Sequence, residues 1–241
     1  MITRGRVLSI MDAAFFRLEQ GIEPPCLTPW RGGAVFRYTN QSIEQALVQK
    51  LARVISSLHA SDVLLEAGFV QEQGVIHRVL DELNEDISFL AIARTNDTET
   101  VLHKRYLKAF FEDQLAEDWK PNSHVKGPDI PSRKSIRAYI KRILGKGVKD
   151  SNASETIARA YGGYVHAASQ NIMDLYGGSP PKFHLGGMLG TPRIQEHRDD
   201  AWNYLYRSLV SVIFVSRAFG DKQLSDALTR ELDQMEVQMG V

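Results

Sequence analysis

Apolar residues recur every three or four positions along most of the chain, and this spacing constrains the fold more than any other feature. Ile43, Leu47 and Leu51 open one such run. Because an α-helix has 3.6 residues per turn, this spacing places apolar side chains on one face that can pack against a core. Alternation typical of a strand is absent, except that residues 35–38 are a candidate for a short extended piece. The sequence therefore predicts an all-α protein.

Capping residues, prolines and glycines divide the chain into segments. Residues 7–19 predict a short amphipathic helix, and the proline- and glycine-rich residues 21–40 predict an irregular arm. Further helices are expected at about 42–68, 69–94, 96–119, 132–144, 152–176, 195–219 and 221–238. A Gly/Pro-rich loop is expected at 177–192. We thus expect residues 1–40 to form an N-terminal helix and arm, and residues 41–241 to form a helical bundle with a single core.

Bulk composition narrows the class of protein. The formal net charge is +0, so no whole-molecule field attracts nucleic acid, and any attraction must come from local clusters. Cys26 is the single cysteine and cannot form an internal disulfide. The most apolar run, residues 208–215, is much shorter than the roughly 20 residues that span a bilayer. We find no signal peptide and expect a soluble, cytoplasmic protein that does not enter a membrane.

One segment, residues 158–169, combines a basic side chain, an imidazole and many small residues. Arg159 and His166 are seven positions apart, which on one helix places both on the same face, about 10 Å apart. Gly162 and Gly163 lie between them, and each costs a helix interior roughly 1 kcal/mol relative to alanine. Such a cost predicts close approach of another backbone or of a ligand to this face.

This pair suits RNA cleavage. A histidine such as His166 can take the proton of a ribose 2′-hydroxyl, and the guanidinium of Arg159 can hold the phosphate without a metal or a cofactor. Tyr161, Tyr164 and, in the Gly/Pro-rich loop, His184 are candidates to contact the substrate. Alternatively, the spacing arises by chance and the aromatic residues are half-buried side chains with satisfied polar tips.

Basic residues are concentrated in a second segment. Residues 131–149 contain seven Lys and Arg residues and no acidic residue. On a helix with a buried isoleucine stripe, Arg133, Arg137 and Lys141 would lie on the outer face and could bind RNA phosphates. Alternatively, this is a solvated face balanced by acidic neighbours, such as those at 112–118.

Over roughly residues 51–176, the chain resembles HEPN ribonucleases, which carry an Arg, four to six residues, and then a His. A branch of that superfamily also has a Tyr before a Val-His pair and an Arg-x-x-x-Glu pair in an earlier helix. The matching residues are Arg78, Glu82, Arg159, Tyr161, Val165 and His166. HEPN ribonucleases often have Asn or Asp directly after the Arg, where this chain has Ala160.

The resemblance implies a HEPN-like helical bundle with additional N- and C-terminal helices. It also implies a metal-independent endoribonuclease that leaves 2′,3′-cyclic phosphates, in a bacterial defence or toxin–antitoxin role. His166 would be the general base and Arg159 the phosphate ligand, in a homodimer that an antitoxin or regulatory protein controls. The alternative is a non-catalytic HEPN-like protein that serves in interaction or regulation.

Overall fold

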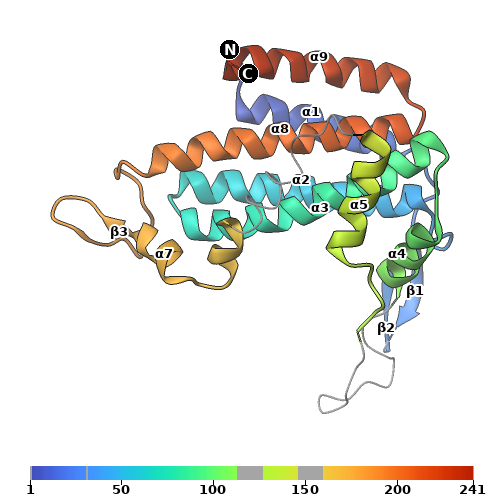
Figure 1. The fold of residues 1–241 in the computed structure, drawn as a ribbon, viewed down its shortest axis with the longest axis horizontal. Coiled ribbons are helices and arrows are strands. Elements are labelled where there is room, and N and C mark those ends of the chain that lie inside the picture. Colours follow the sequence, from blue (N-terminus) through green and yellow to red (C-terminus); the bar gives the residue numbers. More distant parts are fainter. Residues whose placement is uncertain (1, 31, 113–126, 146–159, 241) are drawn as a thin grey trace.

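A computed structural model describes residues 2–30, 32–112, 127–145 and 160–240. Helices make up most of these residues (Figure 1), which confirms the predicted all-α class. Strands occur only in two small antiparallel hairpins within the described ranges. None of the described helices is long and apolar enough to cross a membrane.

The first half of the chain consists of three long helices, one shorter helix and a hairpin. These elements are α1 (Arg4–Glu19), β1 (Cys26–Trp30), β2 (Gly33–Arg37), α2 (Ile43–Glu66), α3 (Val70–Asn96) and α4 (Val101–Phe111). The second half adds α5 (Arg133–Leu144), a helical stretch at 160–165, α7 (Ser169–Ile172), η1 (Met173–Leu175), β3 (Tyr176–Gly177), β4 (Lys182–Phe183), α8 (Ile194–Ala218) and α9 (Lys222–Met239).

Local sequence signals set the ends of α2 and α3. The Ser42 side chain accepts a hydrogen bond from the backbone N–H of Gln45, as the predicted cap requires. Gly68 adopts a φ of 81°, and α3 starts two residues later. Because a glycine takes this left-handed conformation without steric cost, the chain can reverse there. The predicted helices at 42–68 and 69–94 are therefore confirmed to within two residues.

Helices α2, α3 and α8 form the centre of the bundle, with α1 and α9 packed along one side (Figure 1). Helices α3 and α8 run parallel to each other. Met11 and Leu18 of α1 belong to the same hydrophobic core as Leu51 and Leu90. The two ends of the described chain are in contact. The backbone N–H of Ile2 donates a hydrogen bond to the Gln238 side chain at 2.7 Å.

Residues 21–40 are not the irregular arm that their composition predicts, because they contain the β1–β2 hairpin. Leu27 pairs with Phe36, and Pro29 pairs with Ala34. A two-stranded hairpin has only edge strands, so a proline can occupy one without removing a central ladder bond. Gly32, with φ 76°, lies in the turn.

The predicted single helix at 152–176 is also wrong, because residues 166–168 interrupt it before α7 and η1. The described helical stretch ends at Val165. Ala167 then adopts a φ of 51°, and the backbone N–H of Ala168 donates to Gly163 O at 2.9 Å. This bond pattern is a Schellman cap, which normally has glycine at the left-handed position. An alanine there gave no stop signal in the sequence.

Candidate active site

His166 is the first residue after the helical stretch at 160–165, and its backbone N–H still donates to Gly162 O at 3.1 Å. The side chain is exposed, and its ring makes no hydrogen bond or ion pair with the described residues. The cap formed by Ala167 and Ala168 fixes the backbone at this point. His166 is thus a solvent-facing imidazole on an ordered helix end.

Arg159, the predicted partner of His166, lies outside the described residues. The same holds for His124 and for Lys146 and Lys149 at the end of the basic segment. The predicted Arg159–His166 pairing on one face therefore remains a prediction.

The two tyrosines of this helical stretch point inward and not toward an open site. Tyr161 is buried, and its hydroxyl donates to Asp200 Oδ2 at 2.5 Å. The half-buried Tyr164 donates to Asp174 Oδ2 at 2.7 Å. Burial, and then the adjacent carboxylate, raises the pKa of each phenol. The predicted role of Tyr161 and Tyr164 as substrate contacts is not what the geometry favours, since both hydroxyls are engaged within the fold.

Close approach to the glycines of this stretch comes from the chain itself. A Cβ on Gly163 would lie 2.0 Å from Oδ1 of Asn171, on α7. Gly74, on α3, makes room for the ring of Tyr164, which would lie 2.8 Å from an added Cβ. By contrast, an added Cβ on Gly162 would meet nothing within 4 Å. The close approach predicted at residues 162–163 is therefore made at Gly163, by α7 of the same chain.

Arg133 and Arg137, which the sequence assigns to RNA, are bound to carboxylates. Arg133 binds Asp86 and lies 3.5 Å from Glu85 and 3.6 Å from Glu82, all on α3. Arg137 Nε lies 2.5 Å from Oε1 of Glu85. Acidic neighbours that balance these two arginines thus lie on α3, whereas residues 113–118 lie outside the described residues. These ion pairs contradict the expectation that Arg133 and Arg137 lie on the outer face.

Helix α5 nevertheless has an exposed basic side. Lys134, Lys141 and Arg142 are exposed, whereas Ile136 and Tyr139 are buried against the body. The Tyr139 hydroxyl donates to the Thr98 carbonyl oxygen at 3.1 Å, which anchors this face. Lys141 thus has the exposure predicted for it.

His184 supports its own loop. Its Nε2 lies 2.9 Å from the carbonyl oxygen of Gly177, and its backbone N–H donates to Leu175 O at 2.8 Å. These contacts join the two strands of the β3–β4 hairpin, where Tyr176 and Phe183 also make an edge-to-face contact at 4.9 Å. The ring of His184 is half-buried, so its predicted contact with substrate competes with this structural role.

The other described histidines differ from His166, because each ring is bonded or buried. His59 pairs with Asp12 at 3.0 Å. The His103 ring lies 3.0 Å from the Thr100 hydroxyl through Nδ1 and 3.3 Å from Phe89 O through Nε2. The remaining two, His77 and His197, lie in the protein interior.

A row of polar side chains, which we call the polar seam, runs along the buried contact between α3 and α8. The Tyr204 hydroxyl donates to Asp81 Oδ2 at 3.2 Å, and Arg207 lies 2.7 Å from Asp81 Oδ1. One turn further on, Asn84 Oδ1 accepts from the Ser211 hydroxyl at 2.8 Å. The seam therefore pairs Asp81 and Asn84 with groups of α8, where the core would otherwise leave them unpaired.

Sequence reasoning missed the seam and also Asp174 and Asp200, which anchor the two tyrosines. A signal was present in α3, where polar residues occupy the helix face that should carry core residues. Those residues are Gln73, His77, Asp81 and Asn84. Spacings of three and four residues place them on one face, so this stripe could have been identified as a buried polar contact.

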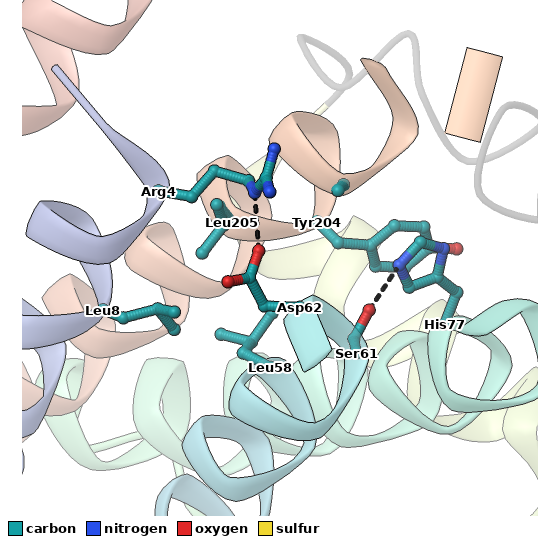
Figure 2. A pocket seen from close by; sticks show the side chains of 9 residues that line it. Arg4, Leu8, Leu58, Ser61, Asp62, His77, Tyr204 and Leu205 are labelled. Atoms are coloured by element: carbon teal, nitrogen blue, oxygen red, sulfur yellow. Dashed lines mark hydrogen bonds and ion pairs between the residues drawn. The ribbon is translucent and has the colours of Figure 1, made fainter. Parts of the chain in front are cut away.

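A small hollow lies beside the seam (Figure 2). Leu8, Leu58, Asp62, Tyr204 and Leu205 are among the residues that line it, and it has room for only about one water molecule. This hollow is too small for a nucleotide. Among the described residues, no three His, Cys, Asp or Glu side chains are grouped so that they could hold a metal ion.

Comparison with known proteins gives no relative, because no protein-family model, curated protein or solved structure matches this chain.

Proposed function

We propose that this protein is a metal-independent endoribonuclease of the HEPN type, with His166 as its general base. The observation that supports the proposal is the state of His166. Among the described histidines, only His166, the histidine of the Arg-x6-His spacing, combines an exposed ring with ring nitrogens that are not bonded to a described residue. A general base must reach the proton that it removes, so a bonded or buried histidine would fit the role less well.

The proposed reaction is an internal phosphoryl transfer. His166 takes the proton of a ribose 2′-hydroxyl, and the resulting oxyanion attacks the adjacent phosphorus. The bond to the 5′-oxygen of the next nucleotide breaks, and that oxygen takes up a proton from solvent. The products are a 2′,3′-cyclic phosphate and a 5′-hydroxyl. We assign phosphate binding to Arg159, whose planar guanidinium can make two parallel bonds to phosphate oxygens.

The proposal carries over what the HEPN resemblance implies. It includes a homodimer, a bacterial defence or toxin–antitoxin role, and a regulatory or antitoxin protein as partner. Lys141 and its neighbours Lys134 and Arg142 are exposed on α5 and would attract the RNA backbone. Arg133 and Arg137 are half-buried against α3, so they would contribute less.

The test is incubation of the purified protein with total tRNA and mRNA in EDTA. The wild type should cleave, and His166→Ala should lose on the order of a hundredfold or more in rate, the usual scale for a general base. His59→Ala is the matched control, because His59 is also exposed but is paired with Asp12. Arg159→Lys should also be poor, since an ammonium group cannot make the forked contact.

Product ends provide a second readout. A cyclic phosphate should be present, and a 2′-deoxyribose at the cleavage position should block the reaction because the internal nucleophile is missing. Cleavage that persists in His166→Ala, or that requires magnesium, would move the chemistry to other residues.

A second candidate is a non-catalytic helical interaction protein, and one observation favours it. Large apolar side chains are exposed in the segment that follows the helix end. They are Val165, Ile172, Met173, Tyr176, Phe183, Leu185 and Leu189. Exposed apolar groups that gather in one segment are typical of a protein-binding surface. Absence of cleavage of any RNA by wild-type protein would favour this candidate.

A further inference from the structure

Two buried histidines lie beneath the helix end that presents His166. His77, on α3, is 1% exposed, and His197, on α8, is 5% exposed. The His77 ring stacks on Tyr204 at 3.9 Å, and its Nε2 lies 3.2 Å from the Ser61 hydroxyl on α2 (Figure 2). In both histidines, Nδ1 is buried and has no hydrogen-bond partner among the described residues.

These rings support the helical stretch at 160–165 directly. The ring of Tyr161 meets His77 edge-on at 5.4 Å, and the ring of Tyr164 meets His197 edge-on at 6.4 Å. The hydroxyl groups of both tyrosines are tied to Asp200 and Asp174, as described above. The attachment of this stretch to α3 and α8 thus depends on packing over two imidazoles.

The surroundings of His77 offer no free carboxylate to a protonated ring. Asp81 is the nearest acidic group on α3, and it is already bonded to Arg207 and Tyr204 of α8. On the α1 and α2 side, Asp62 is bound to Arg4 at 2.6 Å. Burial, followed by the electrostatic effects of His197 and Arg207, lowers the pKa of His77 to about 3.

His197 has acidic neighbours, but each of the closest ones is engaged. Asp200 accepts from Tyr161, and Asp174 accepts from Tyr164 and also binds Arg193 at 2.8 Å. Glu196 is exposed and lies 3.8 Å from Arg193. Burial lowers the pKa of His197 even though Asp200 and Asp174 oppose the shift. Both histidines are therefore neutral in the closed structure at neutral pH.

We propose that His77 and His197 form an acid-sensitive seat, and that protonation of either imidazole releases the helix end that carries His166 from α3 and α8. The one-water hollow beside His77 and Tyr204 gives water a starting point for this opening. Release would expose both rings and let each bind a proton. The opening would disorder the backbone at His166. That this change affects RNA cleavage rests on the proposed function, whereas the opening itself does not.

The direction of the pH effect follows from linkage. A hydrated histidine has a pKa of about 6.5, whereas that of His77 in the closed seat is about 3. The open form therefore binds more protons between these two values. The closed form is fully favoured above pH 6.5 and loses its advantage as the pH falls below that value. Between pH 7.5 and 5.5, hydration of His77 should raise the population of the open form about tenfold, and hydration of His197 should raise it further.

The test is native-state hydrogen exchange of the whole protein at pH 7.5 and 5.5, without RNA and with rates divided by the intrinsic rates. The backbone amides of His166 and Ala168 are the reporters, because both donate within the helix end. Their opening should increase about tenfold or more on acidification, whereas amides of α9 should change little.

Variants separate the seat from general acid effects. His77→Gln and His197→Gln should each reduce the acid-induced increase severalfold, while His59→Gln, which removes an exposed histidine from α2, should behave like wild type. An equal increase in all three variants, or an equal increase in α9, would overturn the proposal.

An NMR titration of the imidazoles in wild-type protein covers the case in which a variant does not fold. His77 should stay neutral at pH 5.5 in the closed form, and the pKa of His197 should lie below that of an exposed histidine. Titration of either near 6.5 in the folded protein would refute the seat. Because neither measurement uses RNA, failure of the ribonuclease proposal would leave these results intact, and the reverse also holds.

Discussion

Asp86 is a buried carboxylate that binds two cationic side chains, Lys50 and Arg133. Its replacement should lower the free energy of unfolding by leaving a buried positive charge unpaired. The Asp86 side chain is 5% exposed and lies 2.8 Å from Lys50 Nζ, on a side chain that is 8% exposed. Asp86 also binds Arg133 of α5. Asp86→Leu would leave the Lys50 ammonium in an apolar site, with the rings of Phe110 and Tyr106 as its remaining close contacts. We expect a loss of about 3–5 kcal/mol in the free energy of unfolding.

Lys50→Met should be milder, because Asp86 keeps Arg133 as a partner. We expect a loss of about 1–2 kcal/mol from that change. The double variant Lys50→Met/Asp86→Leu should recover most of the stability lost by Asp86→Leu, since no unpaired charge remains buried. The coupling energy of this cycle should therefore exceed about 2 kcal/mol.

Urea unfolding followed by circular dichroism at pH 7.5 measures these differences, and an unchanged slope would show that the unfolded states are comparable. The exposed pair Arg6–Glu231, at 3.0 Å, is the matched control, and its cycle should give less than about 1 kcal/mol. The penalty of Asp86→Leu should also shrink as pH rises, because burial lowers the pKa of Lys50 and deprotonation removes the unpaired charge. If Asp86→Leu loses under about 1 kcal/mol, or if the double variant is no more stable than Asp86→Leu, the account of this cluster is incorrect.

Two further predictions concern the helix end and α5. Ala167→Gly should raise the stability by about 0.5–1 kcal/mol in thermal or chemical unfolding, because glycine tolerates the left-handed conformation, whereas Ala168→Gly should not. Arg137→Glu should lower the free energy of unfolding by about 1–3 kcal/mol, since it would place a second carboxylate beside Glu85. Lys134 is exposed, so Lys134→Glu should change the same quantity by less than about 0.5 kcal/mol in the same assay. Equal effects within either pair would show that the local contact does not matter.

Much of the helical framework could be predicted because its signals are local. The Ser42 cap, the Gly68 turn and the apolar spacing of α2 and α3 lie within a few residues of the features that they determine. The stop after Val165 could not be predicted in the same way, because the cap uses Ala167, a residue that favours helix continuation.

The candidate site was harder to predict, because its contacts are distant in sequence. The basic residues of α5 were easy to recognise, but their partners on α3 lie about 50 residues earlier. Tyr161 and Tyr164 likewise gave no indication that Asp200 and Asp174 would hold their hydroxyls. A single sequence without structure assigns such side chains to solvent or substrate, whereas three-dimensional packing commits them to the fold.

The polar seam has a consequence for the order of events during biosynthesis. Its two sides lie on α3, which ends at Asn96, and on α8, which begins at Ile194. At usual elongation rates a ribosome needs roughly 5–20 s to make the about 100 residues between them. Until α8 emerges, Asp81 and Asn84 lie on a nascent helix without Arg207 and Ser211. The central helices can therefore close this part of their core only after the ribosome has passed Ser211, and until then the polar groups of α3 have no partners on α8.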